Sequence, residues 1–210
     1  MNGNSTDNPE PIVGKRGNDM AKNIEKTQKT KEKLINAFWE LYCENKIEKI
    51  TVKAVTDKAG YYRSTFYEYF SDVYEVLEEI ESNLLKKHRF VFEEIFDTKD
   101  FSLIKGIAFE FCEENAEALA ILLGPNGDPK FYAAAKEHIL RCLREVLQVD
   151  SSSKEIQITL EIVSGAIISV LTYWYQHRDL MELQELFDIV LKFFEHGAIS
   201  ILEDLKISIL

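Results

Sequence analysis

The chain has 210 residues, 46% of them hydrophobic and 29% charged, which is enough apolar material for the core of one or two globular domains. No apolar run reaches the roughly 20 residues that span a bilayer, and no signal peptide follows Met1, so we expect a cytoplasmic protein without a membrane segment. The net charge of −11 argues against nucleic acid when taken alone, because DNA affinity comes mostly from cations that meet phosphates.

The distribution of charge carries more information than its total. Residues 1–14 have a net charge of −2, residues 15–75 of +2, and residues 76–210 of −11. The acidic surplus therefore belongs to the last two thirds of the chain. A slightly basic N-terminal part on an acidic body suits a protein that reads DNA with its N-terminal part.

The N-terminal tail, residues 1–25, is rich in Asn, Gly, Pro, Asp and Lys and holds few large aliphatic residues. This composition predicts disorder, because too little apolar surface is available to offset the entropy of ordering. A basic pair within it, Lys15 and Arg16, is more often part of a solvated tail than of a DNA-contacting arm.

Four helices are predicted after this tail. The first covers about 26–46 and has an apolar face at helical spacing, formed by Leu34, Ala37, Phe38 and Leu41. Thr51 offers an N-cap to a short second helix, and Gly60 ends it because glycine adopts the left-handed conformation cheaply. A third helix is expected over 63–69, and Ser71 and Asp72 offer caps to a longer fourth.

The remainder of the chain also has helical periodicity. Helices are expected over 101–114, 116–123, 129–148, 153–177 and 182–203. Between the second and third of these lies a clear break, in which Asp128 can cap a helix that has Pro129 at its first position. No strand-like alternation, long heptad run or internal repeat is found, so the sequence predicts an all-α protein.

Two short helices joined by a tight turn with a glycine, over residues 51–70, have the pattern of a helix-turn-helix. The second helix of such a motif presents its outer face to the major groove of DNA. Phe66 and Phe70 occupy the inner face, and the outer positions are Tyr62, Arg63, Ser64, Thr65, Tyr67, Glu68 and Tyr69. A helix that merely packs aromatic residues explains Phe66 and Phe70 but leaves too many tyrosines to bury.

The stretch AGYYRSTFYEYF, residues 59–70, resembles the recognition signature of the TetR/AcrR family of transcriptional regulators. The preceding TVKAVTDKAG resembles the second helix of that family, and the combined match covers about residues 28–80. The resemblance implies a DNA-binding domain over 26–72 and a helical C-terminal domain over 73–210. With Ser64 added from the outer face, the predicted DNA contacts are Thr51, Lys53, Tyr62, Arg63, Ser64, Thr65, Tyr67 and Tyr69.

Two positions depart from the family pattern. Tyr62 stands where a small hydroxyl residue is usual, so the base preference is expected to differ. Val73 stands where a lysine commonly grips a phosphate, and the neighbouring Asp72 would repel one. DNA affinity is therefore expected to be modest, or to rely more on Lys53, Lys58 and the N-terminal tail.

A second resemblance concerns the C-terminal half. The segments LLGPNGDPKFYAAAKEHI, ISVLTYWYQH and LFDIVLKFFEHG are similar to the effector domains of TetR-like regulators common in Firmicutes. By this resemblance the chain forms a homodimer through the helices at 153–177 and 182–203. These helices are apolar on more than one face, as a helix with two partners must be.

The same resemblance implies a pocket for an unidentified small-molecule effector between the C-terminal helices. Aromatic or polar-tipped candidates are Phe109, Cys112, Tyr132, His138, Tyr173 and Trp174, although each such residue is more often part of a core. The four histidines, His88, His138, His177 and His196, are expected to be isolated, and Cys43, Cys112 and Cys142 have no zinc-like spacing. Neither a metal, a cofactor nor an enzymatic activity is predicted.

These observations together predict a DNA-binding regulator. The family default is a repressor that binds a palindromic operator as a homodimer and is released by a small-molecule effector. An activator or a partner-dependent regulator remains an alternative, because the sequence does not give the sign of regulation. A helical interaction or ligand-binding protein with an idle DNA head is a second alternative.

Overall fold

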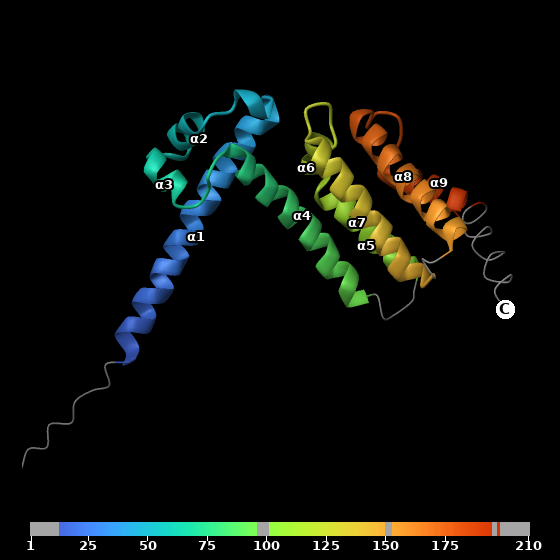
Figure 1. Cartoon of the computed structure of the whole chain (residues 1–210), viewed down its shortest axis with the longest axis horizontal. Coiled ribbons are helices and arrows are strands. Elements are labelled where there is room, and N and C mark those ends of the chain that lie inside the picture. Colours follow the sequence, from blue (N-terminus) through green and yellow to red (C-terminus); the bar gives the residue numbers. More distant parts are fainter. Residues whose placement is uncertain (1–12, 96–100, 150–152, 195–196, 198–210) are drawn as a thin grey trace, which may run out of the picture. The chain divides into compact units, whose positions relative to one another are not determined.

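A computed structural model describes residues 13–95, 101–149, 153–194 and 197 (Figure 1). Within these ranges every regular element is a helix, which confirms the predicted all-α fold. The chain divides into two compact units, Met1–Leu77 and Glu78–Leu210.

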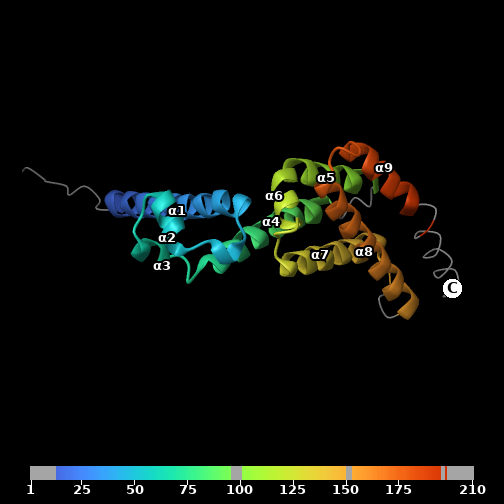
Figure 2. The ribbon, with the colours of Figure 1, turned by 90° about the horizontal axis from the view of Figure 1, so that it is seen from above.

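The N-terminal unit consists of α1 (Val13–Glu44), a 3₁₀ turn (Ile47–Lys49), α2 (Val52–Ala59), α3 (Arg63–Tyr67) and the first residues of α4 (Val73–Ile95). α2 packs on α1, and α3 packs on α2 (Figures 1 and 2). The core between them consists of large side chains that are almost fully buried: Leu34, Phe38, Val55, Phe66, Phe70 and Val76.

The boundary between the units lies inside α4 rather than before it. Val73, Val76 and Leu77, in the first turns of α4, are all buried. These side chains complete the core of the N-terminal unit. The sequence-based boundary at residue 72 divides the chain where α4 begins, whereas its packing places the division after Leu77.

The N-terminal half of α1 shows that the predicted disordered tail was too long. Residues 1–25 were expected to be disordered, but α1 already begins at Val13. Residues 24–29 of this helix are exposed, and Lys29 donates to Glu25 at 2.6 Å, one turn away. Local helix propensity and such i,i+4 pairs, which composition does not reveal, therefore extend the helix without burial. Residues 1–12 lie outside the described residues.

The turn between α2 and α3 agrees with the sequence in detail. The Thr51 hydroxyl oxygen accepts a hydrogen bond from the Ala54 amide, and Gly60 has φ 75° and ψ 33°, so both predicted helix ends are confirmed. α3 ends at Tyr67, two residues before its expected end, because Glu68 is already its C-cap. Asp72 caps α4 by accepting from the amides of Tyr74 and Glu75 at 2.8 and 3.0 Å.

The C-terminal unit contains the rest of α4 and α5 (Phe101–Glu114), α6 (Ala116–Leu122), α7 (Pro129–Leu147), α8 (Lys154–Gln176) and α9 (Leu183–Phe193). α8 packs against α7 and α6, and α5 packs against α9 and α6 (Figure 2). The Asp128 side chain caps α7, as predicted, and the Ser153 side chain caps α8. The expected continuation of α9 to residue 203 lies mostly outside the described residues.

One helix in the described part of the chain, α8, is long and apolar enough to cross a membrane by length and composition. No membrane segment was expected from the sequence, because polar residues interrupt every long apolar run; α8 passes this test on its mean hydropathy despite such residues. Leu160, Val163 and Ile168 of α8 are nevertheless buried within the unit. A single helix of this kind is weak evidence for a membrane segment, since the core helix of a globular domain passes the same test.

Candidate DNA-binding surface and C-terminal cavity

The helix-turn-helix places most of its predicted DNA-contacting side chains at the surface of the N-terminal unit. Tyr62 and Tyr67 are 85% and 59% exposed. Thr65 and Tyr69 are half-buried, and the others are exposed: Thr51, Lys53, Arg63 and Ser64. One face of α3 therefore presents a guanidinium group, hydroxyl groups and aromatic rings to the solvent.

The inner face of α3 explains why these groups point outward. Phe66 is fully buried and packs against Phe70, with ring centroids 5.6 Å apart. Tyr67, the next residue along the helix, meets the edge of the Phe66 ring with its own ring at 5.8 Å. Because the phenylalanines fix the rotation of this short helix, Arg63 and Tyr67 remain accessible to a partner.

The cations near this surface are fewer than the sequence suggested. Lys53 is exposed, whereas Lys58 forms an ion pair with Glu40 of α1, with 2.7 Å between Nζ and Oε2. Val73, at the position of the expected phosphate-gripping lysine, is 6% exposed and belongs to the core. The carboxylate of Asp72 is occupied as the cap of α4, so its role here is structural.

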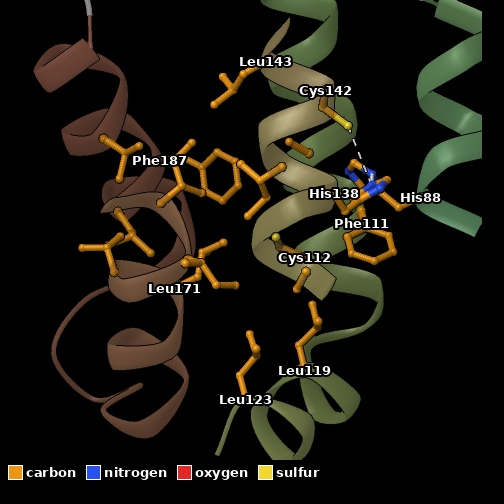
Figure 3. A pocket seen from close by; sticks show the side chains of 18 of the residues that line it. His88, Phe111, Cys112, Leu119, Leu123, His138, Cys142, Leu143, Leu171 and Phe187 are labelled. Carbon is orange, nitrogen blue, oxygen red and sulfur yellow. Dashed lines mark hydrogen bonds between the residues drawn. The ribbon is translucent and has the colours of Figure 1, made fainter. Parts of the chain in front are cut away.

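The C-terminal unit encloses an apolar cavity of about 230 Å³ (Figure 3). Side chains from α4 to α9 line it, including Leu119, Phe131, Leu171 and Phe187. A buried hydrogen bond holds one wall of the cavity in place: the Tyr175 hydroxyl donates to the Cys112 carbonyl oxygen at 3.0 Å. The cavity therefore suits a compact apolar molecule better than a charged one.

Of the six residues predicted to contact a ligand, Cys112 and His138 line this cavity. The other four lie elsewhere. Tyr132 and Tyr173 are 37% and 55% exposed, and Phe109 packs against Phe187 with centroids 5.5 Å apart. Trp174 is buried, but its indole donates to the Met181 carbonyl at 2.9 Å. Residue type alone could not indicate which side of each helix faces the cavity.

Two of the four histidines are not isolated, which corrects the expectation from sequence. His88 Nδ1 of α4 and His138 Nε2 of α7 lie 2.6 Å apart, although 50 residues separate them in the chain. Burial lowers the pKa of both histidines to about 4, so both rings are neutral near pH 7. His177 Nδ1 lies 2.9 Å from the Tyr173 carbonyl, and His196 falls outside the described residues.

Comparison with known proteins agrees with this architecture. Residues 106–197 match the family described as the transcriptional regulator C-terminal region, of TetR type. A TetR transcriptional regulator from Streptococcus agalactiae superposes with a TM-score of 0.63 and 24% identity, over 83% of this chain and 98% of that one. The helix-turn-helix signature on one unit and this match on the other agree with the resemblance found in the sequence.

Over residues 106–197 the chain matches the C-terminal region of TetR-type transcriptional regulators, and its structure has the fold of such a regulator.

Two further solved structures have a similar fold. NalD of Pseudomonas aeruginosa, described as the secondary repressor of an efflux pump, matches with a TM-score of 0.60 and 14% identity, over 81% of this chain and 97% of that one. The dihydroxyacetone kinase operon activator DhaS matches with a TM-score of 0.54 and 18% identity, over 85% and 97%. At such identities the likeness shows the fold alone. No curated protein matches the chain.

The helices α8 and α9 leave an apolar surface exposed in the single chain. Ile158 and Ile162 of α8 are each 62% exposed and stand one helical turn apart. Ile189 and Phe193 of α9 have the same spacing and are 54% and 61% exposed. Four large apolar side chains in two stripes are the kind of surface that a protein partner covers.

Proposed function

We propose that this TetR-family regulator binds a palindromic operator as a homodimer, acts as a repressor in the cytoplasm, and is released by a small-molecule effector. The observation that supports DNA reading most directly is the outer face of α3, where Arg63 stands between exposed tyrosines on a helix braced by α2. Arginine is the side chain that most often pairs with guanine in the major groove, and tyrosine rings and hydroxyls suit thymine methyls and phosphates.

Selection from random duplex DNA at a fixed, moderate salt concentration tests this proposal. The unmodified protein is expected to enrich a palindrome, and the double variant Arg63→Ala/Tyr67→Ala is expected to enrich none. A control with similar residue types away from α3, Tyr132→Ala/Lys154→Ala, should enrich the same palindrome. Equal enrichment by both double variants, or none by the unmodified protein, would contradict DNA reading by α3.

The homodimer is proposed to form through the exposed apolar stripes of α8 and α9. Ile162→Asp places a charge at the centre of the α8 stripe, and burying it in an interface would be costly. Sedimentation is expected to give the mass of a dimer for the unmodified protein and of a monomer for Ile162→Asp. The matched control is Tyr132→Asp on α7, outside both stripes, which should remain dimeric.

The proposed effector is a compact apolar molecule held in the C-terminal cavity. Ala108 lines this cavity, so Ala108→Phe would fill part of it. A panel of small apolar compounds screened by thermal shift should stabilise the unmodified protein and not Ala108→Phe. Equal stabilisation of both proteins would place the binding site elsewhere.

An activating role is a second candidate. DhaS, a structural neighbour, is described as an activator, and Val73, where the family pattern has a lysine, leaves the chain without one cation that would strengthen unaided DNA binding. A reporter behind the selected palindrome distinguishes the two signs of regulation. Repression predicts a higher signal when the regulator gene is deleted, and activation predicts a lower one.

A further inference from the structure

Three groups that commonly bind metals meet at one side of the C-terminal cavity. They are His88 from α4, and His138 and Cys142 from successive turns of α7 (Figure 3). One ligand atom of each lies within 4.8 Å of the other two. His138 is 5% exposed and the other two are partly buried, so the cluster does not belong to the solvated surface.

We propose that His88 Nδ1, His138 Nε2 and Cys142 Sγ form a binding site for a soft d¹⁰ metal ion, with monovalent copper preferred over Zn²⁺. This inference goes beyond the proposed DNA binding and does not depend on it.

The distances nearly match a coordination shell. Metal–nitrogen bonds of ~2.0 Å and metal–sulfur bonds of ~2.3 Å place nitrogen and sulfur about 3.6 Å apart and two nitrogens about 3.3 Å apart. His138 Nε2 and Cys142 Sγ are 3.7 Å apart, and His88 Nδ1 and His138 Nε2 are 2.6 Å apart. The two rings therefore need to separate by less than about 1 Å to admit an ion between them. The third pair, His88 Nδ1 and Cys142 Sγ, lies within 4.8 Å and needs to close by up to about 1.2 Å.

Binding changes where the protons of the cluster lie. In the metal-free site one histidine ring donates a hydrogen bond to the other. Binding requires both rings to turn a lone pair toward the ion, with each remaining proton on the opposite nitrogen. The ion also displaces the proton of the Cys142 thiol, because the thiolate is the ligand.

Charge around the cluster decides between the two metals. Arg89 and Arg141 act on His138, and Glu145 is the nearby carboxylate that acts on Cys142. Monovalent copper with one thiolate is neutral, whereas Zn²⁺ with one thiolate leaves a net positive charge beside two arginines and an apolar cavity. Thiolate suits both metals, but monovalent copper is stable with three ligands, whereas zinc prefers four.

A second pocket gives an ion access to the cluster from its outer side. His138 lines the inner cavity and also a second pocket of about 350 Å³, which Arg89 and Arg141 line as well. The Phe111 ring meets His88 edge-on, with centroids 4.5 Å apart, and covers it from within the unit. An ion can thus enter past His138 and be held away from bulk water.

Anaerobic titration of the full chain with monovalent copper, against a chromophoric copper chelator, measures this site without DNA. We expect one copper per chain and a near-ultraviolet thiolate-to-copper absorption band. Cys142→Ala and His138→Gln are each expected to weaken binding at least roughly tenfold, the lower end of the range for changes to outer-shell partners alone. Zn²⁺ should bind the unmodified protein more weakly than copper does.

Two thiol variants serve as matched controls. Cys112→Ala removes the other cysteine that lines the same cavity, and Cys43→Ala removes the exposed one in the N-terminal unit. Both should bind copper as the unmodified protein does. X-ray absorption of the copper-loaded unmodified protein, expected to show two nitrogens and one sulfur, gives an answer even where a variant fails to fold.

Unchanged copper affinity in Cys142→Ala, a shell without sulfur, or tighter binding of Zn²⁺ would overturn the proposal. Because no DNA is present, failure of this experiment leaves the operator selection unaffected, and failure of the selection leaves copper binding unaffected.

Discussion

In the N-terminal unit, all the predicted DNA-contacting residues lie between Thr51 and Tyr69, whereas the residues that line the C-terminal cavity run from Leu85 to Phe194. The first surface is built from two adjacent short helices, and the second from six helices. A motif that is contiguous in sequence can be recognised from a string of letters. A cavity assembled by packing can be recognised only when the rotation of every helix is known.

The two regions also place their polar groups differently. The surface of α3 is exposed and holds Arg63 among aromatic rings, while the C-terminal unit buries His138 and keeps Ile158 and Ile162 in the open. The positions most informative about function therefore differ between the units. In the N-terminal unit they are aromatic residues outside the core, and in the C-terminal unit they are polar residues inside it.

The largest expected effects separate the stabilities of the two units. Phe66→Ala and Phe131→Ala each remove a fully buried ring, one from each unit, and should each cost about 3–5 kcal/mol of that unit's stability. Hydrogen exchange resolved along the chain should show faster exchange only in the unit that carries the substitution. DNA binding should be lost with Phe66→Ala and kept with Phe131→Ala at low temperature. Equal loss of protection in both units would mean that the chain unfolds as one cooperative body.

Within the DNA-binding surface, Arg63 and Lys53 should differ in kind. Arg63→Ala is expected to cost about 1–3 kcal/mol of operator affinity and to relax base preference at one position in each half-site. Lys53→Ala should weaken all sequences alike and lower the salt dependence by about one phosphate contact. Competition binding at several salt concentrations measures both. Identical profiles for the two variants would contradict the assignment of base reading to α3.

A pH-dependent effect is expected in the C-terminal unit. Burial, followed by the carboxylates of Asp128 and Glu78, raises the pKa of Glu81 from 4.5 to about 7. The folded chain therefore holds a proton on Glu81 that the unfolded chain releases, and the associated stability, complete below pH 4.5, is lost as the pH rises to about 7. At about pH 8, Glu81→Gln should have a free energy of unfolding about 1–2 kcal/mol higher than the unmodified protein, a value already reduced for solvent screening. At about pH 4 the two proteins should be equally stable. A gain that does not vary with pH would exclude titration of Glu81 as its cause.

The smallest expected effect tests the turn of the helix-turn-helix. Gly60 has φ +75°, and a Cβ atom added there would meet nothing within 4 Å, so Gly60→Ala faces only backbone strain. This strain should cost about 1 kcal/mol.

The matched control is Gly106, in the middle of α5, where an added Cβ atom also has open space. Its helical backbone suits alanine, so Gly106→Ala should stabilise the protein by roughly 0.5–1 kcal/mol. Denaturant unfolding of both variants gives the two signs, and a gain for Gly60→Ala would contradict the left-handed turn.

Features that depend on neighbours in the chain could be predicted from the residues alone. Thr51 and Gly60 mark the two ends of α2, Asp128 with Pro129 begins α7, and Phe66 with Phe70 sets the inner face of the DNA-reading segment. Each is a local matter of capping, backbone conformation or helical spacing, so a short window of residues contains the necessary information. The family resemblance rested on the same contiguous stretch.

Which distant side chains meet was settled by the packing of the helices. Packing brought His88 to His138 across 50 residues, and it placed Cys112 on the cavity wall while turning Tyr132 and Tyr173 outward. Composition predicted disorder for residues 13–25, which form the start of α1, because local helix propensity leaves no apolar pattern. Contacts between helices depend on the rotation and crossing of each pair, which many side chains set together, and no single segment of sequence encodes that sum.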